Sequence, residues 1–222
     1  MIDRQPNMNE LREIEQIFKE KYPKAQGNVW DGIVDLQKFS NATCKILWIL
    51  KETNGTDFSD LREALSIQSV NKHLGGFHYV YTKVVLVSHA ILTGDWSNTR
   101  KADALCGDIL PQIAVINVKK QGGGAQASGS VIHSHYKENK ELLLRQVQAI
   151  NPNLIIHANR NTDLFAALDP DPEKIEKIWP FEVAYQKGTG RVLIKAYHPG
   201  CRISSIRYLE LVRHALQSHP LQ

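Results

Sequence analysis

The sequence predicts an α/β protein, a three-layer α/β/α sandwich around a four-stranded, mainly parallel sheet. Four runs of six or seven residues are largely apolar, as strands are when helices cover both faces of their sheet. Segments whose apolar residues recur at helical spacing separate these runs, and such alternation is typical of parallel sheets. A length of 222 residues is compatible with one domain, which we expect to span residues 1–222.

The first apolar run, residues 45–50, predicts a buried strand. Its β-branched and aromatic side chains, and the Thr-Asn-Gly turn that follows soon after it, favour a strand over a turn of buried helix. The other three runs have the same character and are also expected to be strands. The four expected strands span residues 45–50, 113–118, 153–158 and 191–197.

The helices are predicted from the spacing of apolar residues. In the first, expected over residues 9–21, Leu11, Ile14 and Phe18 recur at helical intervals, with Asn7 or Asn9 as a cap. A proline then ends this helix. Further helices are expected over residues 57–69, 79–92, 102–109, 136–150, 163–168 and 208–217.

Two glycine-containing stretches are expected to lie outside helices. Leu74-Gly75-Gly76-Phe77 is expected to end the helix that begins at residue 57, and residues 121–130 are expected to form a flexible loop. No Lys-Ser or Lys-Thr follows the glycines of this loop at the required spacing, so we do not expect a phosphate-binding loop.

The composition is that of an ordinary soluble globular protein, with 42% hydrophobic and 23% charged residues. The net charge of +4 and the pI of about 8.9 permit an anionic partner without requiring one. Cys44, Cys106 and Cys201 are too scattered for a disulfide framework, and the polar N-terminus has no features of a secretory signal. We therefore expect a cytoplasmic protein. It is also expected to be a monomer. No apolar run reaches the ~20 residues of a membrane helix, so no membrane partner is expected.

Polar side chains follow three of the four expected strands. Glu52, Asn117 and His198 come at or just after the ends of the first, second and fourth. Because parallel strands end at one edge of their sheet, these side chains are expected to share that edge, where open α/β sheets bind ligands. Basic residues that flank the same strand ends are expected to hold phosphates. These are Lys119, Lys120, Arg202 and Arg207.

No metal or other cofactor is expected. His133 and His135 form a pair, but the Ser- and Gly-rich sequence around them supplies no third ligand.

At these strand ends the sequence resembles the uracil-DNA glycosylase superfamily, in particular the bacterial family 4 type. Lys51-Glu52-Thr53-Asn54-Gly55 resembles that family's Gly-Glu-Ala-Pro-Gly, and Asn117-Val118-Lys119-Lys120 resembles Asn-Val-Val-Lys. Tyr197-His198-Pro199-Gly200 is similar to Tyr-His-Pro-Ser. Residues 143–147 and 151–156 are similar to a helix and a strand of the same family.

The resemblance covers residues 45–212, and within it the chain departs from the family pattern at several positions. Lys51, Asn54 and Gly200 stand where the family has glycine, proline and serine. The four cysteines that bind the family's iron–sulfur cluster have no counterparts, so no cluster is predicted.

The resemblance implies a hydrolase that removes uracil or a related deaminated base from DNA. Glu52 is expected to orient or deprotonate the attacking water, and His198 to donate a hydrogen bond to the departing base. Asn117 is expected to read O4 and N3–H of uracil, because one amide carries both a donor and an acceptor. Asn54 is assigned to the same base-binding group.

The expected partner is DNA, either single-stranded or with the target base flipped out of the helix. A flipped-out base stacks against an aromatic ring, and Phe77 is the candidate for that ring, with Phe58 as the alternative.

Two other functions remain open at this point. The chain can be a non-catalytic nucleic-acid or nucleotide binding module on the same fold, or a small-molecule N-glycosidase or nucleotide hydrolase that uses Glu52. The site residues also have structural interpretations. In these, Glu52 is a surface carboxylate, Asn117 a strand-end amide, His198 a packed imidazole and Phe77 a core residue.

Overall fold

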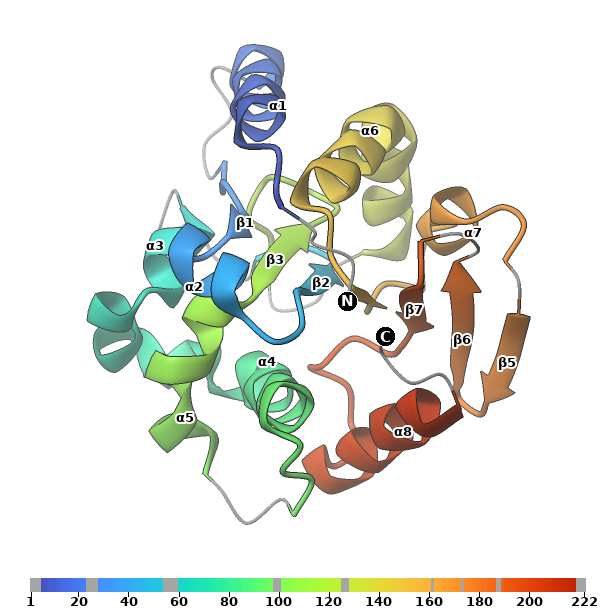
Figure 1. The fold of residues 1–222 in the computed structure, drawn as a ribbon. Helices are drawn as coiled ribbons and strands as arrows, with labels where there is room; N and C mark the ends of the chain where they lie inside the picture. The colour runs from blue at the N-terminus through green and yellow to red at the C-terminus, as the bar shows by residue number, and fades with distance from the viewer. Residues whose placement is uncertain are drawn as a thin grey trace.

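The computed structural model describes residues 5–22, 28–53, 60–97, 101–124, 128–160, 162–172, 174–186 and 189–218, with the main chain alone at 67–79, 174 and 218. This part of the chain forms one seven-stranded sheet and helices that cover both of its faces (Figure 1). The α-helices are α1 (Met8–Lys21), α2 (Leu36–Asn41), α3 (Leu61–Leu65), α4 (Ile67–Thr93), α5 (Ala102–Ile109), α6 (Gly129–Ile150), α7 (Leu164–Leu168) and α8 (Ser205–Ser218), and a 3₁₀ helix spans Leu110–Gln112. The strands are β1 (Gly32–Ile33), β2 (Ile46–Leu50), β3 (Ala114–Asn117), β4 (Leu154–His157), β5 (Lys174–Ile178), β6 (Phe181–Gln186) and β7 (Arg191–Lys195).

The four strands expected from the sequence are confirmed as β2, β3, β4 and β7, and they lie side by side. The strand order is β1-β3-β2-β4-β7-β6-β5, and the three pairings among β3, β2, β4 and β7 are parallel. The expected total of four strands is wrong, because β1, β6 and β5 extend this parallel centre with antiparallel pairings. The α/β class is therefore confirmed, with a mixed sheet of seven strands.

The hairpin of β5 and β6 lacks the signal that revealed the other strands. Residues Lys174–Ile178 read Lys-Ile-Glu-Lys-Ile, and Ile175 is 56% exposed at the edge of the sheet. In β6 the buried Phe181, Val183 and Ala184 are mixed with half-buried polar residues. Strands at or near a sheet edge are partly exposed to water, so polar and charged residues interrupt their apolar residues. A short strand of this composition is hard to recognise in a sequence.

Alternate residues of β2 enter two separate hydrophobic cores. Trp48 packs among buried residues of α4, α5 and α8, while Leu47 and Ile49 pack with residues of α2, α6 and α7. Figure 1 shows α6 and α7 on one side of the sheet and α4, α5 and α8 on the other. The Trp48 Nε1–H donates to Ser88 Oγ at 3.0 Å, so the buried indole keeps a hydrogen-bond partner. Burial on both faces explains why β2 is apolar at every position.

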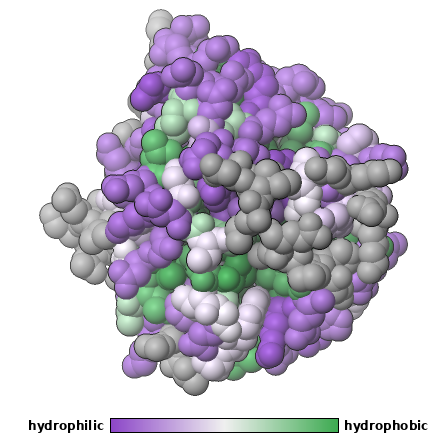
Figure 2. Space-filling view, in the orientation of Figure 1, coloured by the Kyte–Doolittle hydropathy of each residue, from purple (hydrophilic) through white to green (hydrophobic). Residues whose placement is uncertain are grey.

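Helix α1 confirms the expected first helix. It begins after Asn7, whose side-chain oxygen accepts from the Glu10 backbone N–H at 3.2 Å, so Asn7 is the cap. Its buried face carries Ile14 and Phe18. Figure 2 shows the outer surface at the top of the view, over α1, as mostly hydrophilic, which fits a helix with one apolar face.

Helix α4 runs through a glycine-containing stretch that was expected to end a helix, and α6 begins within a stretch that was expected to be a loop. Helix α4 continues past Gly75 and Gly76, and α6 begins at Gly129, earlier than expected, so the loop at residues 121–130 is shorter than expected. A glycine inside a helix costs ~1 kcal/mol relative to alanine. The second half of α4, which packs Val84, Val85 and neighbouring residues into the core, offsets such a cost. Among the described residues, no helix is long and apolar enough to cross a membrane.

Candidate functional site

The segments that follow β2 and β3 continue side by side beyond the sheet. Main-chain hydrogen bonds join Val118 N to Leu50 O at 3.1 Å, Lys119 N to Lys51 O at 2.9 Å, and Gly123 N to Thr53 O at 2.8 Å. The residues after β2 are therefore fixed against the start of the glycine-rich loop. This pairing determines where the Glu52 side chain lies.

Glu52 forms a largely buried ion pair with Lys119. Glu52 Oε2 accepts from Lys119 Nζ at 2.5 Å, and the two side chains are only 7% and 11% exposed. The same ammonium group donates to Gly122 O at 3.2 Å. His135 of α6 lies within electrostatic reach, since burial and the charge of Lys119 lower its pKa while Glu138 and Glu52 raise it. The Glu52 carboxylate is therefore fixed in place by Lys119. Lys119 was expected to be an exposed phosphate contact, but it pairs with Glu52 instead.

Gly123 is required at its position by the Glu52 carboxylate. A Cβ atom built on Gly123 would overlap the carboxylate oxygens, whereas one built on Gly124 meets nothing within 4 Å. Gly123→Ala is therefore expected to displace Glu52 and to lower the rate of any reaction that uses it by about 10-fold, since small misplacements of reacting groups are costly. Gly124→Ala is the matched control and is expected to leave the rate unchanged. Equal rates for both variants would show that the chemistry does not need Glu52 in this position.

Asn117 places an unsatisfied amide in the interior at the end of β3. The residue is 2% exposed and lies opposite Leu50 in the parallel register of β2 and β3. Its backbone N–H donates to Asp31 Oδ2 at 2.8 Å, but its side-chain Nδ2 has no hydrogen-bond partner within the described residues. The hydroxyl of Thr53, which is 8% exposed, likewise lacks a partner in this part of the chain. Buried polar groups without partners are costly, and a bound ligand is one way to satisfy them.

His198 is held as a neutral imidazole at the exit of β7. Its Nδ1 accepts from the Gly200 backbone N–H at 3.2 Å, so in the neutral ring the proton is on Nε2. Burial and the charges of Lys51 and Lys83 lower the pKa of His198 to about 4. The buried Lys83 Nζ donates to Pro199 O at 2.7 Å and to Cys201 O at 3.1 Å, which fixes the turn that carries the ring. The arrangement directs one donor, Nε2–H, away from this turn.

The three expected site residues share the edge of the sheet where the parallel strands end. Asn117 is on the strand next to β2, and His198 follows β7, two strands from β2 on the other side. Their nearest partners differ, because Glu52 pairs with Lys119 while His198 packs against the turn held by Lys83. Lys51, which immediately precedes Glu52, acts on the pKa of His198 and so connects the two parts of the edge.

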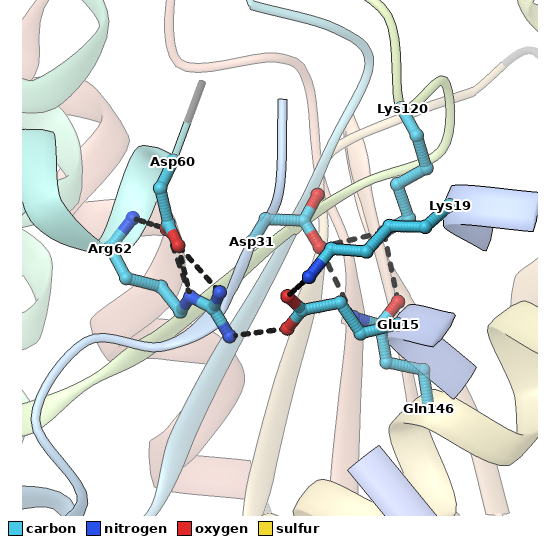
Figure 3. A network of polar contacts seen from close by, with 7 residues as sticks. All are labelled: Glu15, Lys19, Asp31, Asp60, Arg62, Lys120 and Gln146. Atoms are coloured by element: carbon cyan, nitrogen blue, oxygen red, sulfur yellow. Dashed lines mark hydrogen bonds and ion pairs between the residues drawn. The ribbon is translucent and has the colours of Figure 1, made fainter. Parts of the chain in front are cut away.

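Lys120 lies in the interior, where it cannot contact a phosphate. Its Nζ donates to Asp31 Oδ1 at 2.7 Å and to Gln146 Oε1 at 2.8 Å, with the Lys120 and Asp31 side chains 3% and 1% exposed (Figure 3). It also lies 5.4 Å from the centre of the Phe18 ring. Burial lowers the Lys120 pKa, and Asp31 opposes that shift. The expectation that Lys120 binds DNA is corrected accordingly.

Figure 3 also shows a second ion cluster beside this buried pair. Arg62 pairs with Asp60 and, at 2.9 Å, with Glu15, which in turn pairs with Lys19. Glu15 and Lys19 belong to α1, and Arg62 belongs to α3, so the cluster connects the two helices. Its role is structural, because its charged groups are paired with one another.

Of the other expected site residues, two are exposed arginines and three have no described side chain. Arg202 and Arg207 are exposed, and Arg207 pairs with Glu210 at 3.2 Å. Asn54 and Phe58 lie outside the described residues, and Phe77 lies in α4 at a position whose side chain is not described. Lys83 was not among the expected site residues, although a lysine within the strongly apolar segment 79–92 is a signal of a buried, hydrogen-bonded ammonium group.

Metal-ligating side chains do not gather at this edge. Within the described residues, no group of three or more His, Cys, Asp or Glu side chains is placed to hold a metal ion.

Comparison of the chain with protein-family models and with curated proteins finds no match. Evidence on function therefore comes from the arrangement of Glu52, Asn117 and His198 and from the sequence motifs around them.

Proposed function

We propose that this protein is a DNA glycosylase that hydrolyses the N-glycosidic bond of uracil or of a related deaminated base. The observation that carries the proposal is the buried Asn117 amide, whose Nδ2 lacks a partner among the described residues at the edge that also holds Glu52 and His198. An amide that donates through Nδ2 and accepts through Oδ1 is complementary to O4 and N3–H of uracil. The motif resemblance at these same three residues supports this assignment.

In the proposed reaction, the bond between the sugar C1′ and the base nitrogen breaks, and its electron pair leaves with the base. A water oxygen forms the new bond to C1′, and one proton of that water passes to the free carboxylate oxygen of Glu52 and from there to the departing base anion. The neutral His198 ring donates through Nε2–H to the oxygen on which the negative charge of the base develops. Glu52, with Oε2 held by Lys119, orients the water through its other oxygen and stabilises the positive charge on the sugar.

A second candidate function, a non-catalytic nucleic-acid binding module, is favoured by one observation. The Glu52 carboxylate already has a partner in Lys119, and both side chains are mostly buried, as in a structural ion pair. In that case the protein binds DNA but releases no base. Measuring binding and base release on one oligonucleotide separates the two functions.

The proposed setting is the cytoplasm, with the protein acting as a monomer on single-stranded DNA or on a flipped-out base. Cys44 and Cys106 are buried free thiols, and Cys201 is a partly buried one. Free thiols that persist in this form are typical of a reducing compartment.

Base choice tests the role of Asn117. Asn117→Asp removes the donor to uracil O4 and places a carboxylate against that oxygen, so uracil release is expected to fall by about 10- to 100-fold. Affinity for a uracil-free oligonucleotide is expected to change little. The experiment measures release of uracil and of cytosine by the wild type and the variant from the same single-stranded oligonucleotide. An unchanged uracil rate would remove Asn117 from the site and with it the main support for the proposal.

A further inference from the structure

Trp179 is the most exposed large apolar side chain that the structure describes, at 81%. It stands with Pro180 in the turn that joins β5 to β6. The core does not need this indole, because the same hairpin already buries Ile178 and Phe181. The role of this side chain therefore depends on where it lies relative to the candidate site.

The turn that carries Trp179 lies at the edge of the sheet where His198 is found. Strand β5 pairs antiparallel with β6, and β6 pairs antiparallel with β7, so β5 and β7 point the same way and end at the same edge. The register places Glu182 opposite Lys195, which brings the start of β6 beside the end of β7.

Tyr208 of α8 contacts both the start of β6 and the segment that follows β7. Its ring packs edge-on against Phe181 with centroids 5.2 Å apart, and its hydroxyl donates to Tyr197 O at 2.7 Å. Trp179 is two residues from Phe181, and His198 directly follows Tyr197. The turn that carries the exposed indole is thus linked, through Phe181 and Tyr208, to the segment that carries His198.

The edge of the sheet where β4, β5 and β7 end also carries exposed positive charge. Arg160, which follows β4, is exposed and lies 4.8 Å from the centre of the Tyr197 ring. Arg202, in the loop after His198, is exposed as well. Arg207 is paired with Glu210 at 3.2 Å, so Arg160 and Arg202 are the candidate phosphate contacts at this edge.

We propose that Trp179, Arg160 and Arg202 form a binding surface for single-stranded DNA beside the catalytic site. An unpaired base next to the target stacks on the Trp179 indole, and the two arginines contact the phosphates on either side. Exposed aromatic rings among basic side chains bind single strands in this way because every base has a face that stacks. A paired base in a duplex cannot offer that face. The inference rests on the proposed function, since it takes the substrate strand as the occupant.

The test measures binding of a fluorescently labelled oligodeoxyadenylate, which contains no uracil, at a series of salt concentrations. Trp179→Ala is expected to weaken binding by about 5- to 100-fold, the equivalent of one stacked base. Trp179→Phe keeps an aromatic ring and is expected to retain most of the affinity. Ile175→Ala, which removes another exposed apolar side chain from the same hairpin, is the matched control and is expected to bind like the wild type.

The arginines are tested through the salt dependence of the same binding. Arg160→Ala and Arg202→Ala are each expected to lower the slope of log affinity against log salt concentration by about one. Arg213→Ala removes an exposed arginine from the later part of α8 and is expected to leave the slope unchanged.

Three outcomes would overturn this proposal: equal affinity of Trp179→Ala and the wild type, equal affinity for a duplex of the same length, or no binding at low salt. Base release, measured separately on a uracil oligonucleotide, distinguishes this failure from failure of the proposed function. Uracil release that is independent of Trp179 contradicts the binding surface alone. Trp179-dependent binding without release of any base contradicts the glycosylase alone.

Discussion

Replacing Lys120 with alanine is expected to lower the free energy of unfolding by ~3–5 kcal/mol, because it leaves a buried carboxylate without its counter-charge. Lys120 and Asp31 are almost fully buried, and Lys120 also donates to Gln146. The remaining Asp31 keeps bonds from Gln146 Nε2 and from the Asn117 backbone N–H, which do not neutralise it. Urea unfolding of the two proteins at neutral pH measures the difference.

Two further variants show where this loss originates. Arg207→Ala breaks an ion pair whose side chains are 61% and 57% exposed, and it is expected to cost less than ~1 kcal/mol. The double change Lys120→Met with Asp31→Asn removes both charges together and is expected to be less damaging than Lys120→Ala alone. A Lys120→Ala variant that is as stable as the wild type but binds DNA with a weaker salt dependence would contradict this account. It would indicate that Lys120 contacts DNA phosphates.

His198→Ala is expected to lower base release by about 100-fold or more while changing DNA affinity little. The ring is held neutral, with Nδ1 bonded to Gly200 and Nε2–H directed elsewhere, so its donor is already in place before the reaction. A preorganised donor of this kind acts mainly on the transition state, and its loss appears in kcat more than in KM. Single-turnover release of uracil by the variant and the wild type measures the effect.

The control for this variant is His214→Ala, which removes an exposed histidine from α8 and is expected to react at the wild-type rate. Thermal unfolding of both variants checks that the turn from His198 to Cys201 remains folded. A wild-type rate of release by His198→Ala would move the chemistry to another part of the protein.

Most of the parallel centre of the sheet could be predicted, because burial on both faces produces continuous apolar runs such as that of β2. The β5–β6 hairpin could not, since Ile175 faces water and charged residues alternate with it. The course of α4 through Gly75 and Gly76 was also missed, because the packing of its second half outweighs a weak local preference.

The position of the candidate site could be predicted from the sequence, but the ion pairs of its lysines could not. Glu52, Asn117 and His198 were expected at one edge because each follows a buried strand, and the order of the parallel strands agrees. That Lys120 turns inward depends on Asp31, 89 positions earlier in the chain, and nothing in the local sequence shows this. Lys119, its neighbour, pairs instead with Glu52.

The most direct test of the proposed glycosylase is to incubate the wild-type protein with single-stranded oligonucleotides that each contain one uracil, hypoxanthine or xanthine. Free base is then quantified, and alkali-labile sites are mapped on the strand. The expected result is free uracil, or one of the related deaminated bases, with an alkali-labile site at its position, and neither product with His198→Ala. Intact strands for all three bases, from protein that binds those same strands, would contradict the glycosylase and leave the binding module.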